Sequence, residues 1–142
     1  MTKPLAVVIF GAGTEGATLL ATLLHVPGIK ILAMADRDPS LPGFEAAKAA
    51  GVRATRGPVG VSVLRRADVI FDAGGDPALV GPIRRNTRLR PKLLDGPATQ
   101  LALRLLTQYR RGQAHMRHAE RMTAMGNLLA SAAHELNNPL LV

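Results

Sequence analysis

An apolar run that passes straight into a glycine-rich turn limits how this chain can begin to fold. Residues 5–10 read LAVVIF, the next six read GAGTEG, and an apolar helical stretch follows from about Thr14 to His25. β-branched and aromatic residues favour a strand, and a strand that is apolar throughout is buried on both faces of a sheet. The opening therefore predicts a buried strand, a tight glycine turn and a helix.

The same alternation of strand and helix continues through the first 96 residues. We predict further strands at 29–35, 52–55, 68–73 and 92–95, and further helices at 44–50, 61–66 and 77–88. Strands that alternate with helices form parallel sheets, because their crossover connections are right-handed. The predicted fold class is α/β, with a Rossmann-type parallel sheet in the order 3-2-1-4-5.

The amino-acid composition limits the kinds of functional site that the chain can contain. The 142 residues are 47% hydrophobic and 20% charged, which is typical of a globular protein. There is no cysteine, so disulfides, thiolate metal sites and cysteine nucleophiles are excluded, and no metal site is predicted. We find neither a signal peptide nor an apolar run long enough to cross a membrane, and the expected location is cytoplasmic.

The formal net charge is +8, and part of it is clustered at Arg84, Arg85, Arg88, Arg90 and Lys92. Such a run is expected to be a solvated helix face and loop. An anion-binding surface is the alternative. Nucleic acid is not an expected partner, because no aromatic residues accompany the cluster to stack on bases.

The glycine turn itself matches the pattern G-x-G-x-x-G. Gly11 would make the tight turn, Gly13 would let a pyrophosphate approach the backbone, and Gly16 would let helix and strand pack closely. Free N–H groups where the helix starts, at Thr14, would hold phosphate oxygens. An acidic residue, Glu15, is unfavourable beside a pyrophosphate but suits an unliganded helix N-terminus.

The following strand ends at an acid, Asp36, where a carboxylate can accept hydrogen bonds from both ribose hydroxyls. That acid favours NAD over NADP, the adjacent Arg37 softens the preference, and Asp38 is a second candidate for the ribose. Residues 4–96 thus resemble the NAD(P)-binding Rossmann superfamily. The resemblance implies NAD(H) as cofactor and places the strand end 72–76, including Gly74, beside the cofactor. A sheet of this type without a ligand is the alternative.

A second pattern runs from Pro97 to Pro139 with no strong helix breaker. It predicts one continuous helix of about 41 residues, roughly 60 Å long at 1.5 Å per residue. Apolar residues recur at three- and four-residue spacing, which favours a homodimeric coiled coil that widens into a helical bundle. On a helical wheel centred on Leu129, His134 lies at about 140° and points to solvent, while Ala133 lies in the apolar seam.

The segment 133–140 reads AHELNNPL, and residues 118–142 resemble the phosphoacceptor region of the sensor histidine kinases. A neutral imidazole such as that of His134 can attack a phosphate near pH 7. By resemblance, His134 accepts the γ-phosphoryl group of ATP and passes it to the receiver domain of a response regulator. Glu135 would orient the ring, and Asn138 would assist phosphotransfer. The family's ATP-binding kinase domain is absent, so this chain should be inactive alone.

These readings combine into three segments. Residues 1–96 would form a nucleotide-sensing Rossmann-type domain, 97–121 a signalling helix, and 122–142 the truncated start of the kinase dimerisation and phosphoacceptor domain. We thus expect part of a two-component protein-histidine kinase controlled by a dinucleotide. The alternatives are a small NAD-dependent oxidoreductase-like subunit with a helical oligomerisation tail, or a non-catalytic Rossmann scaffold.

Overall fold

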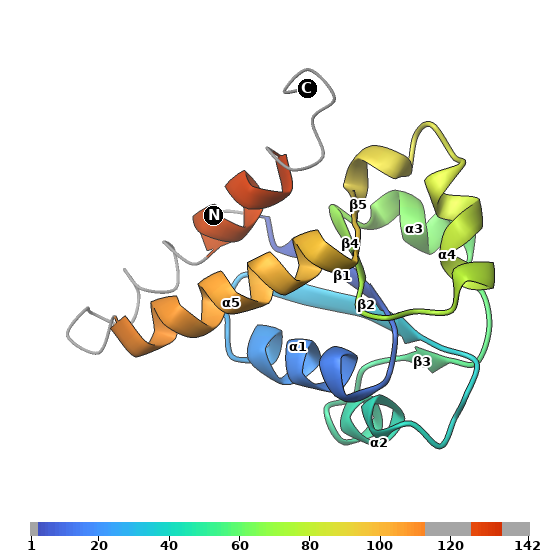
Figure 1. Ribbon diagram of the computed structural model, residues 1–142, viewed down its shortest axis with the longest axis horizontal. Helices are drawn as coiled ribbons and strands as arrows, with labels where there is room; N and C mark the ends of the chain where they lie inside the picture. Colours follow the sequence, from blue (N-terminus) through green and yellow to red (C-terminus); the bar gives the residue numbers. More distant parts are fainter. Residues whose placement is uncertain (1–2, 113–125, 135–142) are drawn as a thin grey trace.

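The computed structural model describes residues 3–112 and 126–134 (Figure 1). Five strands alternate with helices along the chain, as the sequence predicts. The strands are β1 Leu5–Phe10, β2 Ile29–Ala35, β3 Ala54–Thr55, β4 Val69–Asp72 and β5 Leu93–Leu94. The helices are α1 Thr14–Leu24, α2 Pro42–Ala49, α3 Val61–Arg66, α4 Pro77–Arg84 and α5 Gly96–Gly112, with a 3₁₀ turn η1 at Arg90–Lys92.

All strand pairs are parallel, and the order along the sheet is β3-β2-β1-β4-β5. The sheet confirms the α/β class, and its order matches the 3-2-1-4-5 pattern. β1 lies at the centre, with β2 on one side and β4 on the other. Because β1 and its neighbours are parallel, their carboxyl ends meet at one edge, where ligands of such sheets bind.

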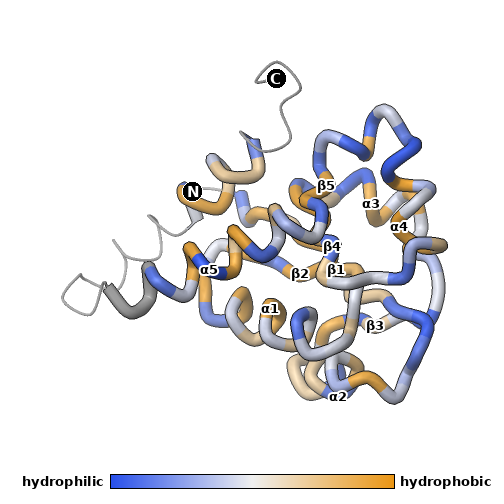
Figure 2. Tube along the Cα trace, in the orientation of Figure 1, coloured by the Kyte–Doolittle hydropathy of each residue, from blue (hydrophilic) through white to orange (hydrophobic). Residues whose placement is uncertain are grey.

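Two hydrophobic clusters cover the two faces of the sheet. One joins α1, α2 and α5 to the sheet, through residues such as Leu20, Ala47 and Leu106. The other holds residues of α3 and α4, among them Leu64 and Val80. Figure 2 shows the hydrophobic colour on the strands and on helix faces, and hydrophilic colour along much of the segment that joins α4 to β5. The result is a three-layer arrangement, with helices packed on both faces of the sheet.

The predicted continuous C-terminal helix is wrong. Helix α5 ends at Gly112, and residues 126–134 form a separate helical segment that lies beside it in Figure 1. Ala102 and Leu129 line the same small apolar pocket between these helices. In one continuous helix they would be about 40 Å apart, since each residue adds 1.5 Å.

The 126–134 segment packs onto its own domain. Leu129 is 1% exposed and Ala133 is 8% exposed, and both belong to the cluster that contains Leu106 of α5. This same chain therefore covers the predicted seam at Leu129 and Ala133, whereas the seam residues Leu101 and Leu105 of α5 are 45% and 36% exposed. His134 is exposed, as the helical wheel predicts.

In the part of the chain that the structure describes, no helix is long and apolar enough to span a membrane. The segment boundaries 1–96, 97–121 and 122–142 stay a prediction, as does a homodimer.

Candidate functional site

Two of the glycines in the turn after β1 are required by the fold. Gly11 has a φ of +113°, and a Cβ there would lie 2.3 Å from the carbonyl oxygen of Ala73. At Gly16 a Cβ would lie 1.9 Å from the carbonyl oxygen of Gly11. Neither position has room for a side chain, because backbone atoms of the turn and of the segment after β4 fill the space. The predicted roles of Gly11 in the tight turn and Gly16 in close packing fit this geometry.

Gly13 is different. A Cβ added there would meet no other atom within 4 Å, and its backbone, at φ −73° and ψ −163°, is open to any residue. It is the N-cap of α1 and provides no side-chain hydrogen bond to the helix. Serine, threonine or aspartate would cap the helix better, because their oxygens accept from the first N–H groups. The fold itself therefore gives no reason for a glycine at this position.

The N-terminus of α1 provides the polar groups of the turn. The N–H groups of the first turn of a helix have no partner within that helix, and they carry the positive end of its dipole. The first intrahelical bond here runs from the Ala17 N–H to the Gly13 carbonyl, at 2.9 Å. Thr14, the first helical residue, is exposed. These N–H groups and the open space at Gly13 together form a cradle of the kind that binds phosphate.

Asp36, the predicted ribose-binding acid, lies against the glycine turn. Its side chain is only 8% exposed. One carboxylate oxygen accepts a hydrogen bond from the Ala12 N–H at 2.9 Å, and the other accepts from the Arg37 N–H at 2.7 Å. Two backbone donors therefore fix the carboxylate at the end of β2, beside the glycine turn. Each oxygen keeps a further lone pair for a ligand hydroxyl.

Across the end of β1, the loop after β4 closes the edge of the site. Gly74 has a φ of +77°, and a Cβ at Gly75 would lie 3.0 Å from the Cβ of Phe10. The loop is pinned by the Gly75 N–H, which donates to Asp72 at 2.9 Å. This tight contact places the strand end 72–76 beside the glycine turn, consistent with the predicted position of Gly74.

The structure reveals one contact that the sequence reading misses. The Nε atom of Arg37 lies 3.0 Å from a carboxylate oxygen of Asp76, and the two side chains are 63% and 25% exposed. The other oxygen of Asp76 accepts from the Ala78 N–H at 2.8 Å and so caps α4. The local signal in the sequence is Asp76 followed by Pro77, a helix start. Its pairing with Arg37 depends on strand order and leaves no local pattern.

Two further acids lie near the site. Glu15 has one buried carboxylate oxygen without a hydrogen-bond partner among the described residues. Asp38 instead forms its own turn, in which the Ser40 hydroxyl donates to it at 2.6 Å and the Ser40 N–H donates at 2.9 Å. The bond from the Ser40 hydroxyl, and after it the bond from the Ser40 N–H, lowers the pKa of Asp38 below its ordinary value of 3.8. Asp36 is the better placed acid for a ligand, because it contacts the glycine turn through the Ala12 N–H, whereas Asp38 bonds only to Ser40 in its own turn.

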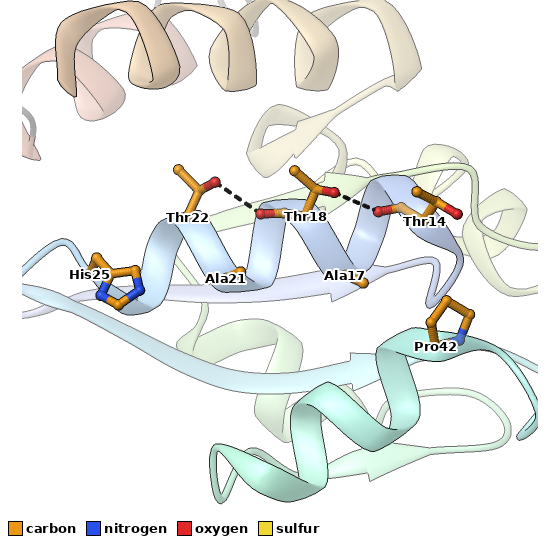
Figure 3. A pocket seen from close by; sticks show the side chains of 7 residues that line it. All are labelled: Thr14, Ala17, Thr18, Ala21, Thr22, His25 and Pro42. Atoms are coloured by element: carbon orange, nitrogen blue, oxygen red, sulfur yellow. Dashed lines mark hydrogen bonds between the residues drawn. The ribbon is translucent and has the colours of Figure 1, made fainter. Parts of the chain in front are cut away.

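A groove of about 510 Å³ follows the outer side of α1 from Thr14 to His25 and reaches Pro42 at the start of α2 (Figure 3). The hydroxyls of Thr18 and Thr22 each donate to a backbone carbonyl of α1, both at 2.9 Å. Their hydrogen-bonding capacity is thus largely used within the helix. The groove adjoins the glycine turn, and its remaining polar side chains are those of Thr14 and His25 at its two ends.

The predicted basic cluster is exposed, as expected for a solvated surface. Arg85, Arg88 and Arg90 are exposed, and Arg84 pairs with Asp72 at 2.9 Å. Lys92 is half-buried and donates to the carbonyl oxygen of Arg65 at 2.9 Å. Basic residues at the ends of α3 and α4 also favour those helices, because the helix C-terminus carries partial negative charge.

Comparison with known proteins finds neither a matching family nor a curated protein that matches the sequence. Among solved structures, the chain resembles a phosphoribosylglycinamide formyltransferase from Coxiella burnetii, at 16% identity and a TM-score of 0.43. That match covers 66% of this chain and 51% of the enzyme, so the chain spans about half of it. It also resembles glycinamide ribonucleotide transformylase 1 from Symbiobacterium toebii, at 14% identity and a TM-score of 0.46, over 93% of this chain and 86% of that one. At these values the likeness carries no inference about activity.

The identification with the sensor histidine kinases is contradicted by these findings. The solved structures that the chain resembles are formyltransferases, not kinases, and no kinase family matches the sequence. The continuous helix of that reading is also absent from the described residues. A Rossmann-type domain without kinase activity fits better. His134 is an exposed residue on the 126–134 segment, and Glu135 and Asn138 lie outside the described residues.

Proposed function

We propose that this chain is a dinucleotide-binding module that takes NAD(H) at the glycine turn after β1. The observation that carries the proposal is the open space at Gly13, where a Cβ would meet nothing within 4 Å. A glycine that the fold does not need, at a helix N-terminus, is explained if a pyrophosphate must approach the backbone there. Gly11 and Gly16 shape the turn, and the first N–H groups of α1, from Thr14 on, supply donors to the phosphate oxygens.

Asp36 would hold the adenosine ribose. Its carboxylate is fixed by the Ala12 and Arg37 N–H groups at 2.9 and 2.7 Å, so it is oriented before a ligand arrives. A fixed acceptor binds two neighbouring hydroxyls without a further loss of side-chain freedom. Arg37 and the loop at Gly74 would border the ligand on its other sides. When bound, NAD(H) can accept or donate a hydride, and we assign no reaction to the chain.

The rival reading is a non-catalytic Rossmann scaffold whose turn holds no nucleotide. One observation favours it: the buried oxygen of Glu15 lies in the first turn of α1, where its negative charge would oppose a pyrophosphate. The same charge stabilises the positive end of an unliganded helix. The two readings therefore predict opposite results for nucleotide binding.

Calorimetric titration of the chain with NAD, NADH, NADPH and ATP separates them. The proposal expects saturable binding of NAD or NADH and at least a tenfold loss of affinity in Gly13→Ala, because the methyl group occupies the phosphate approach. Gly60→Ala is the matched control: Gly60 also caps a helix, α3, with extended backbone, no side-chain cap and free space around it. Absence of binding by the unaltered chain would support the scaffold reading, and equal affinity in Gly13→Ala would place the nucleotide away from the turn; either result contradicts the proposal.

A further inference from the structure

The ion pair between Arg37 and Asp76 joins the two strands that flank the glycine turn. Arg37 follows β2 and Asp76 follows β4, and both strands pair with β1. A contact between them must therefore cross the carboxyl end of β1, where the candidate site lies. The 3.0 Å pair thus links the two sides of the ligand crevice.

We propose that Asp76 shifts the preference of the site toward NAD(H), by holding the guanidinium of Arg37 in this pair. The inference rests on the proposed function and deepens it. NADP(H) differs from NAD(H) by a phosphate on the ribose 2′-oxygen. Asp36 repels that phosphate, so its binding requires a compensating cation. Arg37 is the adjacent cation, and a guanidinium suits phosphate because it donates two parallel hydrogen bonds.

The ion pair with Asp76 limits the ability of Arg37 to offset the repulsion between Asp36 and a 2′-phosphate. With its Nε atom 3.0 Å from Asp76, Arg37 has its charge partly offset, and the Asp36 carboxylate beside it still repels a 2′-phosphate. The paired state therefore favours NAD(H). The Arg37 side chain is 63% exposed, so the guanidinium has room to turn toward a ligand once it is released. Asp76 acts on the ligand through Arg37 and is a positioning residue.

The anchoring of Asp76 permits a clean test. One of its oxygens caps α4 through the Ala78 N–H at 2.8 Å, and the other holds Arg37. Asparagine is as good an N-cap as aspartate, so Asp76→Asn removes the negative charge and keeps the cap. Glu45→Gln is the control for net charge, because Glu45 is an exposed acid in the first turn of α2.

The experiment measures Kd for NADH and NADPH by calorimetry in the unaltered chain, Asp76→Asn, Arg37→Ala, the double variant and Glu45→Gln. We expect Asp76→Asn to raise affinity for NADPH relative to NADH about two- to fivefold, the range that corresponds to exposed ion pairs. In the Arg37→Ala background the same change should leave that ratio unaltered, and Glu45→Gln should not change it. This cycle isolates the effect that passes through Arg37.

An unchanged ratio in Asp76→Asn would overturn the inference, as would an equal rise in the Arg37→Ala background, since Asp76 would then act by its own charge. Both results leave NADH binding, and with it the proposed function, intact. If the unaltered chain binds neither nucleotide, the proposed function fails and the inference fails with it. Thermal denaturation of each variant verifies that it is folded.

Discussion

At Gly11 and Gly16 an added Cβ would meet backbone oxygens at 2.3 and 1.9 Å, whereas at Gly13 it would meet nothing within 4 Å. The pattern G-x-G-x-x-G therefore contains two kinds of glycine. The outer two are required because the chain packs against itself there. The middle one has no such neighbour, and the proposed approach of a pyrophosphate would account for it.

This distinction predicts that alanine at Gly16 costs more stability than alanine at Gly13. Gly16→Ala forces the turn or α1 to shift, and overpacking of this kind costs about 1–3 kcal/mol. Gly13→Ala should cost under about 1 kcal/mol, because it only exchanges one residue for a poorer N-cap. Urea denaturation of both variants measures the two free energies of unfolding. Similar losses for the two substitutions would show that Gly13 also has a structural task.

At the scale of elements, the strands and helices of the first 96 residues follow the sequence closely. β1 is apolar throughout, β4 is apolar up to its last residue, Asp72, and Pro or Gly residues stand at the ends of several helices. The short strands β3 and β5 are less well delimited by sequence, because two residues carry little periodic pattern. The sheet and the turn could thus be predicted from local patterns, together with the position of Asp36.

The packing of α5 and the 126–134 segment could not be predicted from local patterns, for a physical reason. Spacing of three and four residues shows that one face of a helix is buried, but it does not show against what. A seam on a partner helix and a face on the same domain produce the same pattern. Leu129 and Ala133 lie on the buried face, as the spacing predicts. That face packs against the cluster that contains Leu106 of this same chain, and not against a partner helix. The Arg37–Asp76 pair could not be predicted from local patterns either, because it depends on which strands are neighbours in the sheet.

The packing of this segment makes a testable prediction. Leu129 is 1% exposed, so Leu129→Ala should lower the free energy of unfolding by about 2–5 kcal/mol, as for other buried leucines. Leu128→Ala is the matched control, because Leu128 is only partly buried and should cost less. The measurement is urea denaturation at several protein concentrations. If the loss appeared only as weaker self-association, the leucine would belong to an interface between copies instead.

At the scale of the whole molecule, the sheet brings three separate parts of the chain to one edge. The turn after β1, the acid after β2 and the loop after β4 meet at the carboxyl ends of the parallel strands. In the proposed site, the turn would hold the phosphates, the acid would accept from the ribose, and the loop adds a charged residue on the far side. Residues 118–142, whose sequence resembles a kinase segment, are a short stretch that belongs to none of these three parts.

The central claim is that a dinucleotide binds at this edge, and an NMR titration of the ¹⁵N-labelled chain with NADH tests it most directly. The account predicts saturable shifts of the amide signals of Gly13, Thr14 and Arg37, with smaller changes at Gly74 and none along β3. The same titration of Gly13→Ala should leave these signals nearly unmoved. No shifts at all, or shifts confined to the groove side of α1 at Ala17 and Ala21, would contradict the claim.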